Sequence, residues 1–440
     1  MSNILIKNIL ILPMSQAEDS PRYFEGSIGV SGSKIEFVSA DATLVQAFER
    51  KYSSEGLTII DGKGKLAMPG LVNTHNHVAM TIMRSYADDM VLNEWLEKKI
   101  FPFEDMLTRD DIFQGARFGM AEMLLGGTTA FVDMYWNNDA LADAALETGM
   151  RAVAGCSLVD ASVAKFEREI EMMVSKYRGV SDTLSIYAAP HAPYTCGPDA
   201  IKRVVAICDK YSLGVHTHIN ETQWELDVIK KNYGVDPVSY YDNLGLFDRP
   251  TIAAHAVYVD DRDIELFVRK GINIAHNPQS NMKMSAGIAP VAKMLDAGVN
   301  VALGTDGTCS NNDLDMWDEM RTAAFLQKVS TGDPCAMNAY QTLEMATVRG
   351  ARAIGRGDDL GRLEVGFQAD IVLVDIEKPH YYPRNDMASL LVYCGKASDV
   401  DTVLVAGEVV VRGGELSSGD VMDYASGVDD IASRIKKQLA

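Results

Sequence analysis

At 440 residues, the chain is long enough for one barrel-sized domain and a smaller second domain. Its composition, 47% hydrophobic and 23% charged, is typical of a globular protein and excludes a fibrous or disordered one. The net charge of −20 argues against nucleic acid as a partner, because a polyanion is bound by a basic surface.

The compartment is predicted from the cysteines and from the absence of targeting patterns. The six cysteines are scattered and form no CxxC pair, which indicates reduced thiols rather than a disulfide framework. The apolar stretch at 3–13 is interrupted by Lys7 and Asn8 and has no small-residue cleavage site, so we interpret it as a strand. No apolar run approaches the ~20 residues of a membrane span. We expect a cytoplasmic protein that binds no membrane.

The two ends of the chain show the same kind of sequence pattern. Residues 1–66 contain short strand patterns separated by glycine-bearing breaks, and similar patterns return in residues 356–440 before a charged helical tail. Each end alone is marginal in size for an independent sheet. We therefore expect both ends to pair in one small β-sandwich domain, with a helix at the C-terminus.

Between these ends, residues 67–355 alternate short apolar runs with longer amphipathic stretches such as 110–126 and 198–211. This alternation predicts an α/β fold of repeated strand–helix units with a parallel sheet. Eight such units match the size of a TIM-like (β/α)8 barrel. The predicted strands are 71–78, 128–134, 151–159, 183–192, 213–220, 251–257, 272–278 and 300–306.

Seven of the eight histidines fall at or near the ends of these predicted strands. The C-terminal ends of barrel strands converge on one mouth, where active sites form, so we expect these histidines to meet there. An isolated histidine is more often a core residue, but this grouping argues against that interpretation. The polar residues at the strand ends are His75, His77, His191, His216, His218, His255, His276 and Asp306.

The i, i+2 spacing of His75 and His77 predicts a metal site. Alternate strand residues face the same side, so both imidazoles can bind one ion. Imidazole suits zinc or iron(II), and a carboxylate such as Asp306 can complete the ligand set. Spacing alone does not choose between His216 and His218 as a further ligand.

Several stretches together resemble the amidohydrolase superfamily, in particular its methylthioadenosine/S-adenosylhomocysteine deaminase branch. They are PGLVNTHNHVAM, HINET, AAHAV and LGTDGTCSNN, with FPFED, APHAPYTC and AHNPQSN. The similarity extends over essentially the whole chain. It implies hydrolytic deamination of an adenine nucleoside that carries a modified 5′ position, such as 5′-methylthioadenosine or S-adenosylhomocysteine, with release of ammonia and the inosine analogue.

The resemblance also implies a ligand set for one divalent metal per chain, zinc or alternatively iron: His75, His77, His218 and Asp306. Some superfamily members bridge two metals with a modified lysine at the end of the fourth strand. Here that strand ends in AAPHAPY and offers no lysine, so one metal is expected. His216 is then expected to have a structural role.

Catalytic and substrate-binding roles follow from the same resemblance. It implies that Glu221 carries a proton, that His255 stabilises the tetrahedral adduct and that Asp306 accepts a proton from water. His191 is expected to contact the substrate base and Glu104 the ribose hydroxyls, with Glu221 and Asp306 also at the substrate.

One position departs from the family pattern. Relatives that accept S-adenosylhomocysteine carry an arginine for its carboxylate where this chain has Cys156. A thiol cannot form the bidentate pair that arginine makes with a carboxylate. A neutral 5′-substituent is therefore favoured, unless Lys165 or Arg168 compensates.

Two alternative functions are open. A related hydrolase could act on guanine, a pterin or a triazine, but Glu104 favours a substrate that carries ribose. A non-catalytic scaffold is the remoter alternative, and the complete residue set argues against it. The other zinc-deaminase fold is excluded, because its HxE and PCxxC strings are absent. We expect a small-molecule nucleoside as substrate and a homo-oligomeric protein.

Overall fold

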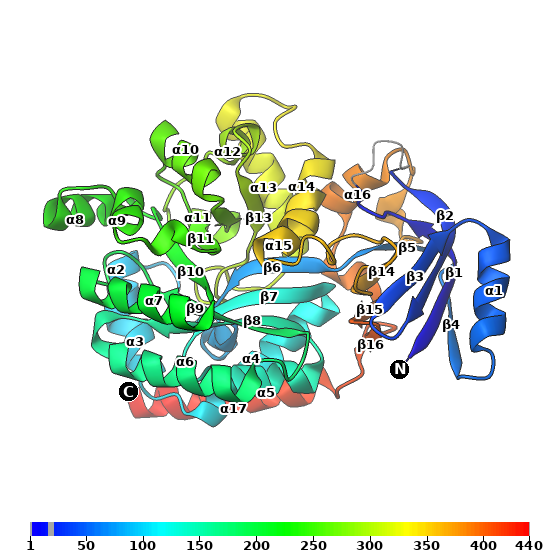
Figure 1. The fold of residues 1–440 in the computed structure, drawn as a ribbon, viewed down its shortest axis with the longest axis horizontal. Coiled ribbons are helices and arrows are strands. Elements are labelled where there is room, and N and C mark those ends of the chain that lie inside the picture. Colours follow the sequence, from blue (N-terminus) through cyan, green and yellow to red (C-terminus); the bar gives the residue numbers. More distant parts are fainter. Residues whose placement is uncertain (1, 16–21, 440) are drawn as a thin grey trace.

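The structure, a computed structural model, describes residues 2–15 and 22–439 (Figure 1). Eight parallel strands lie side by side in chain order, each paired with the next. Each strand overlaps one of the eight predicted runs, so the predicted eight-stranded parallel barrel is confirmed. The strands are β6 (Leu71–Asn76), β7 (Thr128–Tyr135), β8 (Arg151–Leu158), β9 (Leu184–Pro190), β10 (Gly214–Ile219), β11 (Thr251–His255), β12 (Asn273–His276) and β13 (Asn300–Leu303).

The barrel closes between its last strand, β13, and its first, β6, through individual hydrogen bonds. The backbone nitrogen of Asp306 donates to the carbonyl oxygen of His75 at 3.0 Å. The Thr74 hydroxyl donates to the Leu303 carbonyl oxygen at 2.8 Å. A side chain at Gly304 would push these strands apart, because a Cβ there would lie 2.8 Å from the His75 backbone nitrogen. This seam brings His75 and Asp306 next to each other.

Amphipathic helices surround the barrel, and local sequence determines where they begin and what they bury. α4 begins at a capping box in which Thr108 and Asp111 bond each other's backbone nitrogen. α6 buries Phe166, Ile170, Met173 and Tyr177, which recur at helical spacing. The helices are α4 (Arg109–Leu125), α5 (Asn138–Thr148), α6 (Val163–Tyr177), α7 (Pro198–Tyr211), α8 (Gln223–Tyr233), α9 (Pro237–Asn243), α10 (Asp261–Lys270), α11 (Pro278–Lys283), α12 (Val291–Asp296), α13 (Met316–Thr331), α14 (Ala339–Ala346) and α15 (Val348–Ala353).

Short helical turns lie in the connections between these elements. Four of them follow β6 directly and lead to Glu104. They are η1 (Val78–Met83), α2 (Leu92–Trp95), η2 (Leu96–Ile100) and α3 (Phe101–Glu104), with η3 (Asp160–Ser162), η4 (Leu246–Asp248), η5 (Pro379–Tyr381) and η6 (Ala397–Asp399) farther along the chain.

The two ends of the chain form one mixed sheet, so their predicted pairing is confirmed. β5 joins them, because it pairs with β1 from the N-terminal end and with β14 from the C-terminal end. Apolar side chains of β1 and β14 share a core on one face of this sheet. The strands are β1 (Asn3–Ile11), β2 (Phe24–Ser31), β3 (Lys34–Ser39), β4 (Leu57–Asp61), β5 (Lys65–Pro69), β14 (Ile371–Asp375), β15 (Val400–Val405), β16 (Glu408–Arg412) and β17 (Glu415–Leu416). The domain boundaries at 66 and 355 stay a prediction.

Three details of these end segments differ from the sequence pattern. The strand pattern of 361–376 yields only β14, because Gly361 and Gly366 adopt positive φ angles of 83° and 86° that interrupt an extended chain. An additional helix, α1 (Ala42–Tyr52), packs Phe48 against Phe37 of the sheet. The third difference is the position of the C-terminal helix.

The C-terminal helix α17 (Val421–Leu439) lies along the barrel beside α4, away from the small sheet (Figure 1). Arg434 donates to Asp111 of α4 at 2.6 Å. Its apolar face joins a cluster that contains Trp95, Ile100 and Phe103. The remaining helix, α16 (Met387–Cys394), precedes β15. Within residues 2–15 and 22–439, no helix has the length and apolar character needed to cross a membrane.

A buried ion pair joins the barrel to the small sheet. Arg151, at the start of β8, donates from Nε and Nη2 to both carboxylate oxygens of Asp370, at 3.1 and 3.0 Å. The two side chains are 3% and 2% exposed. Asp370 also accepts from the backbone nitrogen of Ala406 at 2.8 Å. Its carboxylate thus bonds both the barrel and the small sheet, and its buried charge is paired by Arg151.

We expect Arg151→Ala to lower the free energy of unfolding by about 3–5 kcal/mol, because it leaves the Asp370 carboxylate buried without its cation. Chemical denaturation followed by circular dichroism measures this loss. Arg203→Ala is the matched control, since Arg203 makes the same two-point contact with Glu167 on the surface. Its effect should be small. Equal losses in both variants would contradict the role assigned to the buried pair.

Candidate active site

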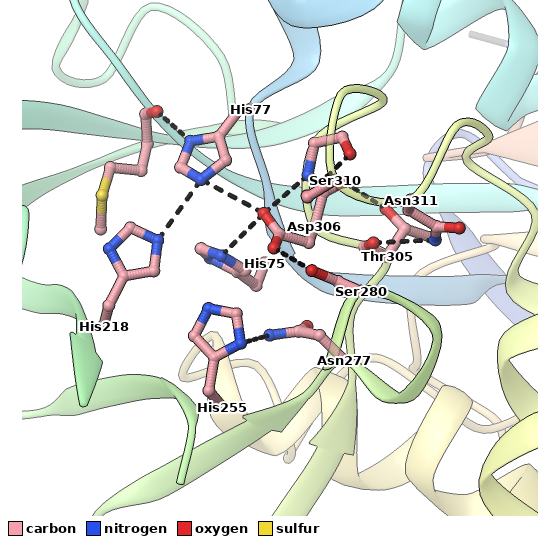
Figure 2. A network of polar contacts seen from close by, with 12 residues as sticks. His75, His77, His218, His255, Asn277, Ser280, Thr305, Asp306, Ser310 and Asn311 are labelled. Carbon is pink, nitrogen blue, oxygen red and sulfur yellow. Dashed lines mark hydrogen bonds and ion pairs between the residues drawn. The ribbon is translucent and has the colours of Figure 1, made fainter. Parts of the chain in front are cut away.

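The C-terminal ends of the barrel strands open into a cavity of about 520 Å³. Most of the residues predicted for the site line this cavity, from six separate segments of the chain. They are His77, Glu104, His191, His218, Glu221, His255 and Asp306. His75 is fully buried and lies among His77, His218, His255 and Asp306 (Figure 2). The structure therefore brings the whole predicted set together.

Backbone carbonyl oxygens determine which nitrogen of His77 and His218 carries the hydrogen. A carbonyl oxygen only accepts, so a ring nitrogen that bonds it must donate. His77 Nδ1 donates to Met134 at 2.7 Å, and His218 Nδ1 donates to His191 at 2.6 Å. Each neutral ring therefore presents the lone pair of Nε2 to the cavity. These two Nε2 atoms lie 3.4 Å apart.

His216 determines which ring nitrogen of His75 carries the hydrogen. His216 Nδ1 donates to the Ile252 carbonyl oxygen at 3.1 Å, so its Nε2 accepts from His75 Nδ1 at 2.8 Å. The lone pair of His75 Nε2 is then free. That nitrogen is buried and has no hydrogen-bond partner among the described residues. His216 thus lies behind His75, whereas the ligand atoms of His75, His77 and His218 lie within 4.8 Å of one another.

Asp306 supplies a carboxylate to this group of lone pairs. Its Oδ1 lies 3.4 Å from His75 Nε2 and 3.3 Å from His77 Nε2. Three nitrogen lone pairs and one carboxylate oxygen therefore converge, and one of the nitrogens is an orphaned buried atom. Such a set fits a divalent cation that prefers nitrogen and oxygen ligands.

The pKa values of the histidines agree with metal binding. Burial lowers the pKa of His75 to about 4 and that of His218 well below its ordinary value, so both stay neutral. Burial also opposes a charge on His77, but its contact with Asp306 outweighs this and raises the pKa to about 9. A cation that binds His77 would displace a proton from it.

His255 and Glu221 face each other across the cavity, with His255 Nε2 4.0 Å from Glu221 Oε2. Burial raises the pKa of Glu221, so its carboxyl group can hold a proton closer to neutral pH. The Glu221 backbone nitrogen donates to the Glu225 carboxylate at 3.0 Å, which fixes the turn that carries Glu221. Sequence reasoning missed Glu225. The one signal for it in the sequence is an acidic residue three positions after Thr222, the N-cap of α8.

Glu104 also lines the cavity; it is buried and accepts a hydrogen bond from the Tyr135 hydroxyl at 2.8 Å. Burial raises the pKa of Glu104 to about 8, although the bond from Tyr135 opposes this. His191 lies beside His218, with ring centres 4.8 Å apart, and burial lowers its pKa to about 3, so its ring is neutral. Both residues can exchange hydrogen bonds with a bound molecule.

Cys156 does not line the cavity. Its side chain belongs to the buried apolar cluster that also contains Ala154 and Leu158 of the same strand. The next residue, Ser157, lines the cavity together with Lys165 of α6.

The chain was compared with known proteins. Residues 66–410 match the model of the amidohydrolase family. A 5-methylthioadenosine/S-adenosylhomocysteine deaminase from Desulforudis audaxviator (strain MP104C) is 44% identical over 413 residues, 93% of this chain and 94% of that protein. A protein of the same name from Moorella thermoacetica is 42% identical over 442 residues, 100% of this chain and 99% of that protein. The crystal structure of an adenosine deaminase from Xanthomonas campestris with bound zinc aligns with a TM-score of 0.93 at 32% identity, over 99% of both chains.

We expect His216→Phe to weaken zinc binding about 10–100-fold, because His75 loses the partner that directs its lone pair toward the other ligands. Competition with a chromogenic chelator measures the affinity. His276→Leu is the matched control, since His276 is equally buried and neither of its ring nitrogens has a hydrogen-bond partner among the described residues. Unchanged zinc affinity in His216→Phe would show that His75 needs no such support.

Proposed function

This chain belongs to the amidohydrolase family, and we propose that it is a metal-dependent deaminase of 5′-modified adenine nucleosides. Methylthioadenosine and S-adenosylhomocysteine, which the names of its relatives contain, are the candidate substrates. One observation carries the proposal: the three histidine lone pairs and Asp306 converge at a cavity that Glu221 and Glu104 also line.

We propose one zinc ion per chain, held by His75, His77, His218 and Asp306. The zinc in the Xanthomonas structure supports the identity of the metal. The single lysine among the described residues that line the cavity is Lys165, which is exposed and lies on α6, so a lysine-bridged pair of metals is not favoured. When bound, zinc supplies Lewis acidity that lowers the pKa of a water molecule to about 7.

The protein's own groups then move the protons. Asp306 accepts a proton from the attacking water. Glu221 delivers a proton to the ring nitrogen beside the amino-bearing carbon, which makes that carbon electrophilic. His255 hydrogen-bonds the oxygen that adds to this carbon. The second water proton passes to the amino group, the carbon–nitrogen bond breaks and ammonia leaves. The proton held by Asp306 then restores the one that Glu221 gave up, so that one water is consumed and one ammonia is released.

The rest of the cavity supports a nucleoside rather than a free heterocycle. The Glu104 carboxyl group can exchange hydrogen bonds with two neighbouring ribose hydroxyls, which guanine, pterins and triazines lack. We propose that His191 contacts the base and that apolar side chains of η2 and α3, which line the same cavity, cover the sugar. Homo-oligomeric assembly and a cytoplasmic location stay predictions from the sequence.

A substrate screen with metal analysis tests the function. The purified protein should contain close to one zinc per chain and deaminate 5′-modified adenosines faster than guanine, a pterin or a triazine. In the same assay, Glu221→Gln should retain zinc and lose ~10²-fold or more in kcat, because the amide cannot carry the proton. Glu265→Gln, on the exposed face of α10, is the control. Turnover near the wild-type value in Glu221→Gln would exclude this residue as the proton carrier.

The 5′-substituent is the least constrained part of the proposed substrate. A buried carboxylate costs several kcal/mol unless it is paired. Lys165 is the cation that lines this part of the cavity, 5.9 Å from the centre of the Trp136 ring. The lysine is exposed, so water screens its attraction for a carboxylate. Glu169, a buried acidic residue, lines the same region and would repel one.

We therefore expect a higher kcat/KM for methylthioadenosine than for S-adenosylhomocysteine. Lys165→Met should lower kcat/KM for S-adenosylhomocysteine by up to about tenfold and leave methylthioadenosine unchanged, because only the former carries a carboxylate. Arg168→Met is the control, since Arg168 is exposed on the same helix and does not line the cavity. A wild-type preference for S-adenosylhomocysteine that survives in Lys165→Met would contradict this account.

A further inference from the structure

The AHNPQSN stretch has so far no role in the proposed mechanism. It forms the end of β12 and most of α11, and it places two polar side chains, Ser280 and Asn281, in the protein interior. Both are buried, with 0% and 1% exposure. We propose that α11 positions two reacting groups at once, Asp306 through Ser280 and His255 through Asn281. This inference rests on the proposed deaminase function.

Ser280 acts on the proposed proton acceptor. Its hydroxyl donates to Asp306 Oδ2 at 2.7 Å (Figure 2). The backbone nitrogen of Gly307 donates to Oδ1 at 2.7 Å. With Oδ2 held by serine, Oδ1 is the oxygen that faces His75 and His77. The Asp306 backbone has a φ of 62°, a conformation that non-glycine residues rarely adopt, so regular strand geometry does not direct this side chain.

Asn281 acts on His255. The amide oxygen of Asn281 lies 2.9 Å from His255 Nδ1, and an amide oxygen only accepts, so Nδ1 carries a hydrogen. Nε2 is thereby directed into the cavity toward Glu221. The amide nitrogen of Asn277 is 3.4 Å from the same Nδ1, but both atoms then carry hydrogens, so Asn281 is the partner that accepts from the ring. His255 and Ala256 have φ angles of 77° and 47°, so this ring too leaves an irregular backbone and needs a partner.

Backbone hydrogen bonds tie Asn281 of α11 to the chain before it and after it. The Asn281 backbone nitrogen donates to the Asn277 carbonyl oxygen at 3.0 Å, and its carbonyl oxygen accepts from Ala286 at 2.8 Å. The two positioning residues are adjacent in the chain. A shift of one would therefore move the other, and α11 fixes the spacing between Asp306 and His255. Ligand atoms of these two residues and of His75 lie within 4.8 Å of one another.

Four variants of the zinc-loaded enzyme test the proposal with a 5′-modified adenosine. Ser280→Ala and Asn281→Leu should each lower kcat about 10–100-fold, while KM changes less than about threefold, because orientation rather than binding is lost. Asn281→Asp keeps an oxygen acceptor and should recover most of the activity. Met282→Ala, on the exposed face of the same helix, is the control and should match the wild type.

A double-mutant cycle separates positioning from a structural role. Asn281→Leu should cause no further loss of kcat in a His255→Ala background, because it acts through that ring, whereas Ser280→Ala should still lower kcat there. Ser280→Ala should also weaken zinc binding in chelator competition, and Asn281→Leu should not. Wild-type kcat in both single variants, equal losses in Asn281→Leu and Asn281→Asp, or full losses of Asn281→Leu in both backgrounds would overturn the proposal.

These outcomes differ from a failure of the proposed function. If the wild type deaminates no 5′-modified adenosine, the deaminase assignment fails, and the zinc competition still decides the contact between Ser280 and Asp306. In that case, equal zinc affinity in Ser280→Ala and wild type would overturn the inference as well. Thermal unfolding of each variant checks that a lost activity does not reflect a lost fold.

Discussion

The active site depends on where three imidazole hydrogens are placed. His77 and His218 each donate their Nδ1 hydrogen to a backbone carbonyl oxygen, and His75 donates its own to His216. In its neutral form, each ring therefore presents a lone pair to the centre. Buried lone pairs that face one another without hydrogens between them are unfavourable unless a cation lies among them. The protein thus prepares an electrostatic environment for a metal through its backbone, before any ligand bond forms.

This arrangement makes the site a property of the whole barrel. The carbonyl oxygen that holds His77, directly after β6, belongs to β7, and the one that holds His218 of β10 follows β9. β11 holds His216 of β10, which reaches across to β6. The register of neighbouring strands therefore determines how the proposed ligand side chains are oriented. The same ends contain left-handed backbone at Asn220, His255 and Asp306, strain of about 1–3 kcal/mol each that the neighbouring hydrogen bonds must offset.

Much of this could be predicted from the sequence, because strand–helix alternation and the spacing of His75 and His77 are local signals. The eight strands and their polar ends follow from that pattern alone. Other features depend on contacts between distant segments. Spacing could not separate His216 from His218, because both face the barrel interior and only the packing of His75 distinguishes them. It could not orient Cys156, which the structure places in the core, nor place α17 beside α4. The catalytic roles of the site residues stay predictions.

The position of α17 has a consequence for biosynthesis. This helix is synthesised after the whole barrel, and its apolar face packs against Trp95, Ile100 and Phe103, in the segment that leads to Glu104. The residues proposed as metal ligands all precede it in the chain by more than a hundred residues. A nascent chain therefore contains every proposed ligand while Trp95 and Ile100, which line the cavity, still lack the support of α17. The order of synthesis places the strand ends of the barrel first and the helix that supports this part of the cavity wall after them.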